Sequence, residues 1–127
     1  MIEKANLAEK LERFADYFAP RTVGVFNGHD VMVAKLRGPF IWHKHDDTDD
    51  FFLVLQGTLD IELRDRTVTL GAGEMFVVPK GVEHRPVARD EVTCFLSNRR
   101  AHPIRAMRGR LRLGRGFESG RCDQAAR

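Results

Sequence analysis

The hydrophobic positions of this chain follow two different periods. In the stretch 6–18 apolar residues recur every three or four positions, which is the spacing of one face of an α-helix. These positions are Leu7, Leu11, Phe14 and Phe18. Asn6 can cap this helix, with Glu9 as its capping-box partner, and Pro20 would end it. The pattern predicts a short amphipathic helix within residues 1–20, packed on the rest of the protein.

From position 22 onward the period is that of β-strands. Short segments rich in Val, Phe, Leu and Thr are separated by Gly, Asp, Asn and Pro, which is typical of an all-β sandwich or barrel. In the segment 58–63, Leu59 and Ile61 alternate with Asp60 and Glu62, as expected for a strand with one buried face. The predicted strands cover 22–27, 31–36, 40–45, 51–56, 58–63, 67–70, 74–79 and 92–97.

The strand pattern ends near Leu96. Residues 97–127 contain nine Arg, no Lys and two acidic residues, a formal charge of +7, so the other 96 residues carry −4 of the net +3. We therefore predict a barrel over 21–97 and a flexible Arg-rich tail over 98–127. Because the folded part is acidic, the overall charge does not indicate nucleic-acid binding. A basic arm for nucleic acid or acidic partners remains the weaker alternative for the tail.

Other features of the sequence concern the cellular compartment. The charged first residues do not resemble a signal peptide, and no apolar run reaches the roughly 18 residues of a membrane helix. Cys94 and Cys122 have neither metal-site nor redox spacing. We expect one domain, in a reducing cytoplasm and away from membranes.

Two histidines one residue apart begin the acidic stretch 42–50, WHKHDDTDD. On a strand, His43 and His45 point to the same face, with Cα atoms roughly 6.5–7 Å apart. Two such imidazoles can converge on one metal ion. The same pattern also fits two surface histidines, so it indicates a metal site only if further ligands are found.

The stretches 38–57 and 73–84 supply those ligands. In the first, His43, Lys44 and His45 are followed by four residues, then Asp50, then six residues and Gly57; in the second, the fixed positions are Gly73, Pro79, Gly81 and His84. These spacings resemble the two motifs of the cupin superfamily, and the chain looks like a small single-domain bacterial cupin. The resemblance extends over residues 20–96.

The resemblance implies a jelly-roll β-barrel, a double-stranded β-helix, in which four side chains meet. They are His43, His45, Asp50 and His84. These ligand types suit a divalent transition metal, and the sequence does not choose among Fe, Mn, Ni, Zn and Cu. The remaining acids of the acidic stretch, Asp46, Asp47 and Asp49, are expected in a solvated loop.

Three positions depart from the family pattern. Four residues separate Gly38 from His43 instead of five, and Ala88 occupies the place of an asparagine. Asp50 occupies the place of a glutamate and is shorter by about 1.5 Å of reach. Either the backbone moves inward, or Asp50 acts through water, or three histidines hold the ion alone. If reach is limiting, Asp50→Glu should tighten metal binding.

The resemblance allows two classes of function. One is a small metal-dependent enzyme, dioxygenase-like or isomerase-like, that acts on a small organic molecule in the barrel. The other is a non-catalytic module that binds a small molecule or a metal. Separately, if Asp50 faces inward, the other side of the strand 51–56 carries an apolar strip, which predicts a homodimer. The strip consists of Phe51, Leu53 and Leu55.

Overall fold

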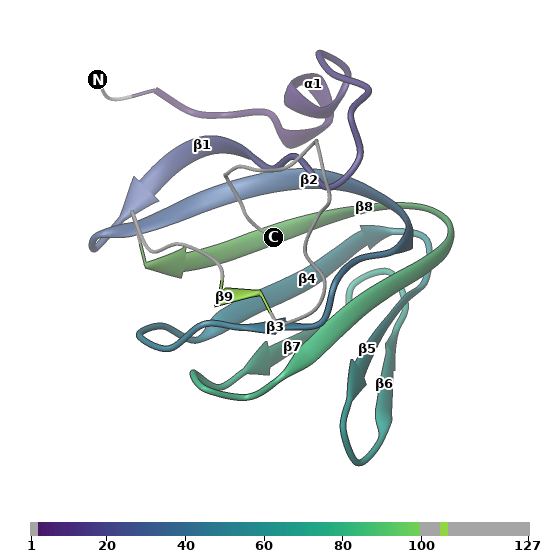
Figure 1. Cartoon of the computed structure of the whole chain (residues 1–127). Helices are drawn as coiled ribbons and strands as arrows, with labels where there is room; N and C mark the ends of the chain where they lie inside the picture. Colours follow the sequence, from purple (N-terminus) through teal and green to yellow (C-terminus); the bar gives the residue numbers. More distant parts are fainter. Residues whose placement is uncertain (1–2, 100–104, 107–127) are drawn as a thin grey trace.

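The computed structural model describes residues 3–99 and 105–106, and in this part it forms one short helix and an antiparallel β-barrel (Figure 1). The elements are α1 Leu7–Leu11, β1 Arg21–Phe26, β2 His29–Pro39, β3 His43–Lys44, β4 Asp50–Gln56, β5 Leu59–Leu63, β6 Thr67–Leu70, β7 Met75–Val78, β8 His84–Arg99 and β9 Arg105–Ala106. The all-β jelly-roll prediction is confirmed.

Strand β8 connects the two layers of the barrel. Its second half pairs with β2 on one side and β4 on the other, and its beginning pairs with β5 and, at His84, with β3. Between the halves lies an exposed section, Arg89 to Glu91, where β8 bends around one end of the molecule (Figure 1). The bend places His84 opposite His43 of β3.

The core lies between these layers and follows the period of two in the sequence. In β4, Phe52 and Val54 are buried and the residues between them are only partly buried. In β5, Leu59 and Ile61 have no exposed surface, as the alternation in 58–63 predicts. Gly57 must be glycine, because its φ is +95° and an added Cβ would lie 2.9 Å from the Glu91 carbonyl oxygen.

The helix is shorter than the sequence predicts. It begins after the cap Asn6, whose side chain accepts a hydrogen bond from the Glu9 amide, and it ends at Leu11, whereas the apolar spacing continued to Phe18. The residues after Leu11 make contacts that are incompatible with a continued helix or replace its hydrogen bonds. Lys35 of β2 donates its ammonium to the Phe14 carbonyl oxygen at 2.7 Å, and Phe18 has a φ of +56°, which no α-helix allows.

Several strand boundaries also differ from the prediction, and β2 extends over His29–Pro39 instead of 31–36. Of the predicted strand 40–45, only His43–Lys44 is a strand. By contrast, β8 starts at His84 instead of 92, with His84, Pro86 and Ala88 buried and the residues between them partly exposed. Pro86 and the charged residues around it conceal this alternation, and pairing with β5 stabilises it.

The predicted tail contains one described strand. Arg105–Ala106 forms β9, which pairs with both residues of β3, and this pairing was not predicted. The other positions from 100 onward lie outside the described residues, so the flexibility of the tail stays a prediction. No helix in the described part of the chain is long and apolar enough to span a membrane.

Candidate metal centre

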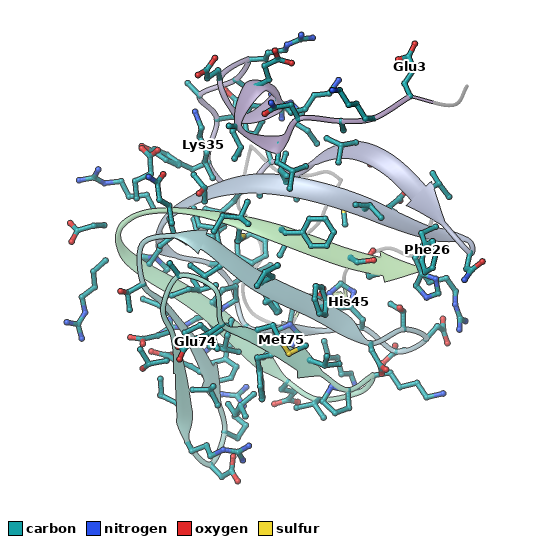
Figure 2. All side chains as sticks on the ribbon, turned by 180° about the vertical axis from the view of Figure 1, so that it is seen from behind. Glu3, Phe26, Lys35, His45, Glu74 and Met75 are labelled. Carbon is teal, nitrogen blue, oxygen red and sulfur yellow. The ribbon has the colours of Figure 1, made fainter. Side chains whose placement is uncertain are left out.

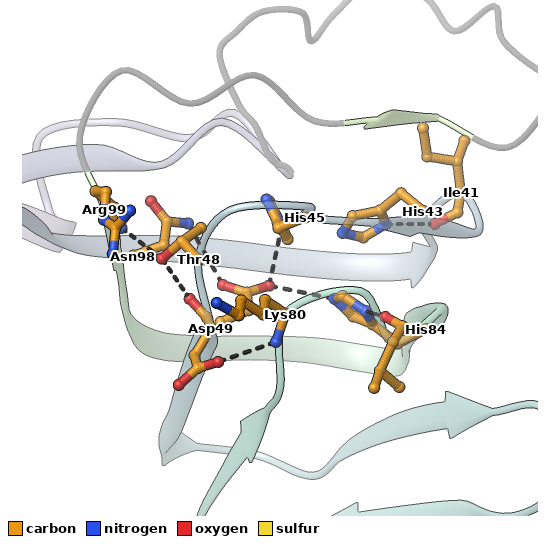
Figure 3. Close-up of polar contacts among 11 residues, drawn as sticks. Ile41, His43, His45, Thr48, Asp49, Lys80, His84, Asn98 and Arg99 are labelled. Carbon is orange, nitrogen blue, oxygen red and sulfur yellow. Dashed lines mark hydrogen bonds and ion pairs between the residues drawn. The ribbon is translucent and has the colours of Figure 1, made fainter.

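Four side chains from three strands and one loop meet inside the barrel (Figure 3). His43 lies on β3, His45 follows it, Asp50 is the first residue of β4 and His84 is the first residue of β8. Their exposed fractions are only 1%, 3%, 5% and 1%, respectively. The nitrogen and oxygen atoms that could bind an ion all lie within 4.8 Å of one another. The structure therefore brings together the four residues that the sequence selected.

Two of the histidines are oriented by the backbone. Nδ1 of His43 lies 2.8 Å from the Ile41 carbonyl oxygen, and Nδ1 of His84 lies 2.9 Å from the Val82 carbonyl oxygen. A carbonyl oxygen only accepts, so each Nδ1 carries the proton and donates it. This directs each Nε2 into the cluster, where a deprotonated Nε2 can bind an ion, which is the usual arrangement of metal-binding histidines.

His45 has no such support. Among the described residues, neither of its ring nitrogens makes a hydrogen bond, although both are buried. Its Nε2 lies 3.4 Å from Asp50 Oδ2, within ion-pair distance but without hydrogen-bond geometry. Leaving a buried polar atom without a partner costs about 1–3 kcal/mol. An ion bound at this nitrogen would remove that cost.

Asp50 lies between the imidazoles. Its Oδ2 is 3.2 Å from Nε2 of His84 as well as 3.4 Å from Nε2 of His45. Burial by itself raises the pKa of the Asp50 carboxyl, but the adjacent His45 and His84 outweigh burial and hold this pKa well below its usual value. The side chain is thus a carboxylate, the form that binds metal ions.

The spacing of these atoms fits a transition metal ion. Two ligand atoms at about 2.1 Å from a tetrahedral ion are about 3.4 Å apart, and the distances from Asp50 Oδ2 to the two Nε2 atoms are 3.2 and 3.4 Å. The shorter carboxylate therefore reaches the cluster. Of the three alternatives that the sequence left open, the geometry favours a direct position for Asp50.

A further polar residue at the cluster was missed by the sequence reasoning. Asn98 of β8 donates its side-chain amide to Asp50 Oδ1 at 3.4 Å. Ala88, where the family has asparagine, is fully buried in the apolar core. Asn98 lies beyond the second motif and follows no motif spacing, so only the pairing of β8 with β4 could have found it.

The loop between His45 and Asp50 is fixed by its polar groups. Thr48 is buried, and its hydroxyl oxygen accepts a hydrogen bond from the Arg99 amide. Asp49 accepts one from the Lys80 amide (Figure 3). Asp46, Asp47 and Asp49 are exposed, as predicted for a solvated loop. The acidic stretch thus divides into Asp50 at the cluster and acids at the surface.

A small pocket adjoins the cluster. Its polar part consists of His43, Asp50 and Asn98. The rest of its wall is apolar and comes from β2, β4, β8 and the segments that precede β1 and follow β2: Phe18, Pro20, Leu36, Phe40, Phe52, Pro86 and Leu96. Among the residues that the structure describes, neither lysine nor arginine contributes to this wall.

The protein is a small antiparallel barrel with three histidines and a carboxylate inside it. This combination is typical of barrel proteins that can hold a metal ion. The family model for the cupin domain (Cupin_2) matches residues 31–97, which include all four cluster residues. The chain therefore belongs to the cupin domain family.

Bacterial proteins resemble the chain over most of its length. It is 34% identical over 86 residues to the uncharacterized protein YdbB of Bacillus subtilis (strain 168), covering 67% of this chain and 76% of YdbB. A cupin-2 domain protein structure from Shewanella frigidimarina NCIMB 400 is 42% identical, with TM-score 0.74 and coverage of 76% and 94%. Protein NMB1881 from Neisseria meningitidis is 30% identical, with TM-score 0.70 and coverage of 76% and 98%.

Proposed function

We propose that the protein is a metal-dependent cupin that binds one divalent transition metal ion through His43, His45, His84 and Asp50. The observation that carries the proposal is the buried cluster itself. Three imidazoles and a carboxylate share one small volume, and two of the Nε2 atoms are directed there by backbone hydrogen bonds. Within the described part of the chain, neither ring nitrogen of His45 makes a hydrogen bond.

We further propose that the ion acts on a small organic molecule bound in the adjoining pocket, as a dioxygenase-like or isomerase-like enzyme. A bound ion of this kind supplies Lewis acidity, and Fe, Mn, Ni, Zn and Cu all suit these ligands. The residues hold the ion, exclude bulk water through the apolar wall and keep Asp50 ionised. A non-catalytic module that binds a metal or a small molecule is the second candidate, because the described residues that line the pocket include no titratable side chain other than His43 and Asp50.

Metal content by mass spectrometry tests the metal site. We expect about one ion per chain in the wild type and loss of stoichiometric metal in His43→Ala, His45→Ala and His84→Ala, because each substitution removes one of the four ligands. His29→Ala is the matched control, since His29 lies at the start of β2, hydrogen-bonded to the Asn27 carbonyl oxygen. Equal metal content in all five proteins would contradict the site.

Activity separates the two candidates. The metal-loaded wild type is screened for oxygen consumption and for isomerisation of small organic molecules, with the His84→Ala variant as the blank. Turnover that requires the metal supports an enzyme, and binding without turnover supports the non-catalytic module.

A cytoplasmic location is part of the proposal. The protein's two cysteines, Cys94 and Cys122, are too few for the disulfide framework that small secreted domains use. Fractionation of cells that produce the full chain tests this, and recovery from the extracytoplasmic fraction would contradict it.

A further inference from the structure

Two phenylalanine rings lie over one side of the metal cluster. Phe40, between β2 and β3, meets His43 edge to face with ring centroids 5.2 Å apart. Phe18, in the segment before β1, stacks on Phe40 with centroids 4.9 Å apart and only 12° between the ring planes. The rings of Phe18, Phe40 and His43 therefore form a column that ends at a metal-binding side chain.

Phe18 is held in this column by a segment that is neither helix nor strand. Its amide donates to the Lys35 carbonyl oxygen at 2.9 Å, and the neighbouring Tyr17 hydroxyl donates to Glu91 at 2.8 Å. The φ of Phe18 is +56°, a strained value for a bulky side chain. Such strain persists only where surrounding contacts impose it, and it is common at ligand-binding sites.

The pocket below this column is too small for an organic molecule while Phe18 stays in place. Its volume is about 20 Å³, enough for about one water molecule. Phe18 itself forms part of the wall. A ligand that reaches the metal cluster through this pocket must therefore displace a ring, and Phe18 is the ring on the strained segment.

We propose that the organic ligand of this site is a flat ring compound with no negative charge and one oxygen donor, and that it stacks on Phe40 in the place of the Phe18 ring. The ligand should be flat because it would replace the Phe18 ring, whose plane is only 12° from that of the Phe40 ring. The absence of a negative charge follows from the described part of the wall, which contains the Asp50 carboxylate and neither Lys nor Arg. The oxygen donor faces the metal ligands and the Asn98 amide, so this part of the inference rests on the proposed metal function.

Binding of phenol to the full-length protein tests the inference, with Kd measured by calorimetry or ligand-observed NMR on metal-loaded and metal-free samples. Phe18→Ala removes the competing ring, so phenol should bind about 3- to 10-fold more tightly than to the wild type. Phe40→Leu removes the stacking surface but keeps an apolar side chain, and phenol should bind about 3- to 10-fold more weakly. Phe26→Ala is the matched control and should stay within about 2-fold of the wild type, a margin that corresponds to less than about 0.5 kcal/mol.

The control lies far from the pocket. Phe26 is 69% exposed at the end of the hairpin β1–β2, at the opposite end from Lys35, which holds the Phe18 segment (Figure 2). Cyclohexanol and gluconate complete the set of probes. Cyclohexanol has the size of phenol without flatness, and gluconate is polar and anionic, so both should bind more weakly than phenol to the wild type.

The outcomes distinguish this inference from the metal proposal. Weaker phenol binding to Phe18→Ala would show that Phe18 is a wall for the ligand and would overturn its displacement. Preference for gluconate or cyclohexanol would overturn the ligand class. If the protein holds metal but binds no phenol, only this inference fails. If it holds no metal while phenol follows the expected order in metal-free protein, only the metal function and the role of the oxygen donor fail.

Discussion

Replacing Asp50 by glutamate gives opposite expectations from the family motif and from the geometry. The motif has glutamate at this position, so the substitution should restore a ligand and tighten metal binding. In the structure, however, Asp50 Oδ2 is already 3.2 and 3.4 Å from the Nε2 atoms of His84 and His45. These distances match the separation of about 3.4 Å between two ligands on one tetrahedral ion. We therefore expect Asp50→Glu to weaken metal binding.

The size of this effect follows from the added methylene. It extends the side chain by about 1.5 Å, whereas metal–ligand distances tolerate about ±0.2 Å. Asp50 is only 5% exposed, and inserting a methylene into a packed interior costs about 1–3 kcal/mol. Since 1.4 kcal/mol is a factor of ten, the Kd for the metal should rise by about 5- to 140-fold.

Competition with a chromophoric chelator measures this Kd for the wild type, Asp50→Glu and Asp50→Asn. Asp50→Asn keeps the shape of the side chain and removes its charge, so it should also bind the ion more weakly than the wild type. Asp65→Glu is the control, because Asp65 is an exposed acid between β5 and β6. Tighter binding by Asp50→Glu than by the wild type would refute the geometric reasoning and favour the family's longer ligand.

Four other measurements test the structure. Asn98→Ala should weaken metal binding about 10-fold, near the lower limit for a group that orients a ligand, because the hydrogen bond from Asn98 to Asp50 is long at 3.4 Å. An unchanged Kd for the metal would contradict this role of Asn98. The lowered pKa of Asp50 stabilises the fold above the ordinary Asp pKa of about 3.9 and is lost as the pH falls through the lowered pKa. Urea unfolding of metal-free protein should therefore show a steeper loss of stability below about pH 4 in the wild type than in Asp50→Asn, and parallel curves would exclude this contribution. Light scattering should give a homodimer of 14.5 kDa chains, and a monomeric wild type would refute the dimer. Met75 lies on the outward face beside Leu53 and is 49% exposed, so the Met75→Lys variant should be monomeric. Deleting residues 107–127 should leave the melting temperature within a few degrees of that of the full chain. Deleting residues 100–127 also removes β9, the partner of β3, and should lower the melting temperature. Equal melting temperatures of the two truncated proteins would show that β9 contributes no stability.

The sequence by itself determined the barrel and the members of the cluster. Alternation such as that of Leu59 and Ile61 with Asp60 and Glu62 defines a strand face regardless of its partner, because successive side chains of a strand point to opposite sides. The spacing of His43, His45 and Asp50 was informative for a similar reason, since His43 and Asp50 begin the consecutive strands β3 and β4 and His45 lies in the short loop between them.

Only the tertiary structure decided how these residues are supported. Asn98 contacts Asp50 from 48 positions away, and the Phe18 ring lies on Phe40 although the helical spacing had placed Phe18 on a helix face. The length of β8 likewise depends on its neighbours, because a strand containing Pro86 is stabilised by pairing with β5 on one side. Local patterns specify which face of an element is apolar, but which distant side chain meets it depends on the register of the strands and the bend of β8, and these are set by the packing of the whole barrel.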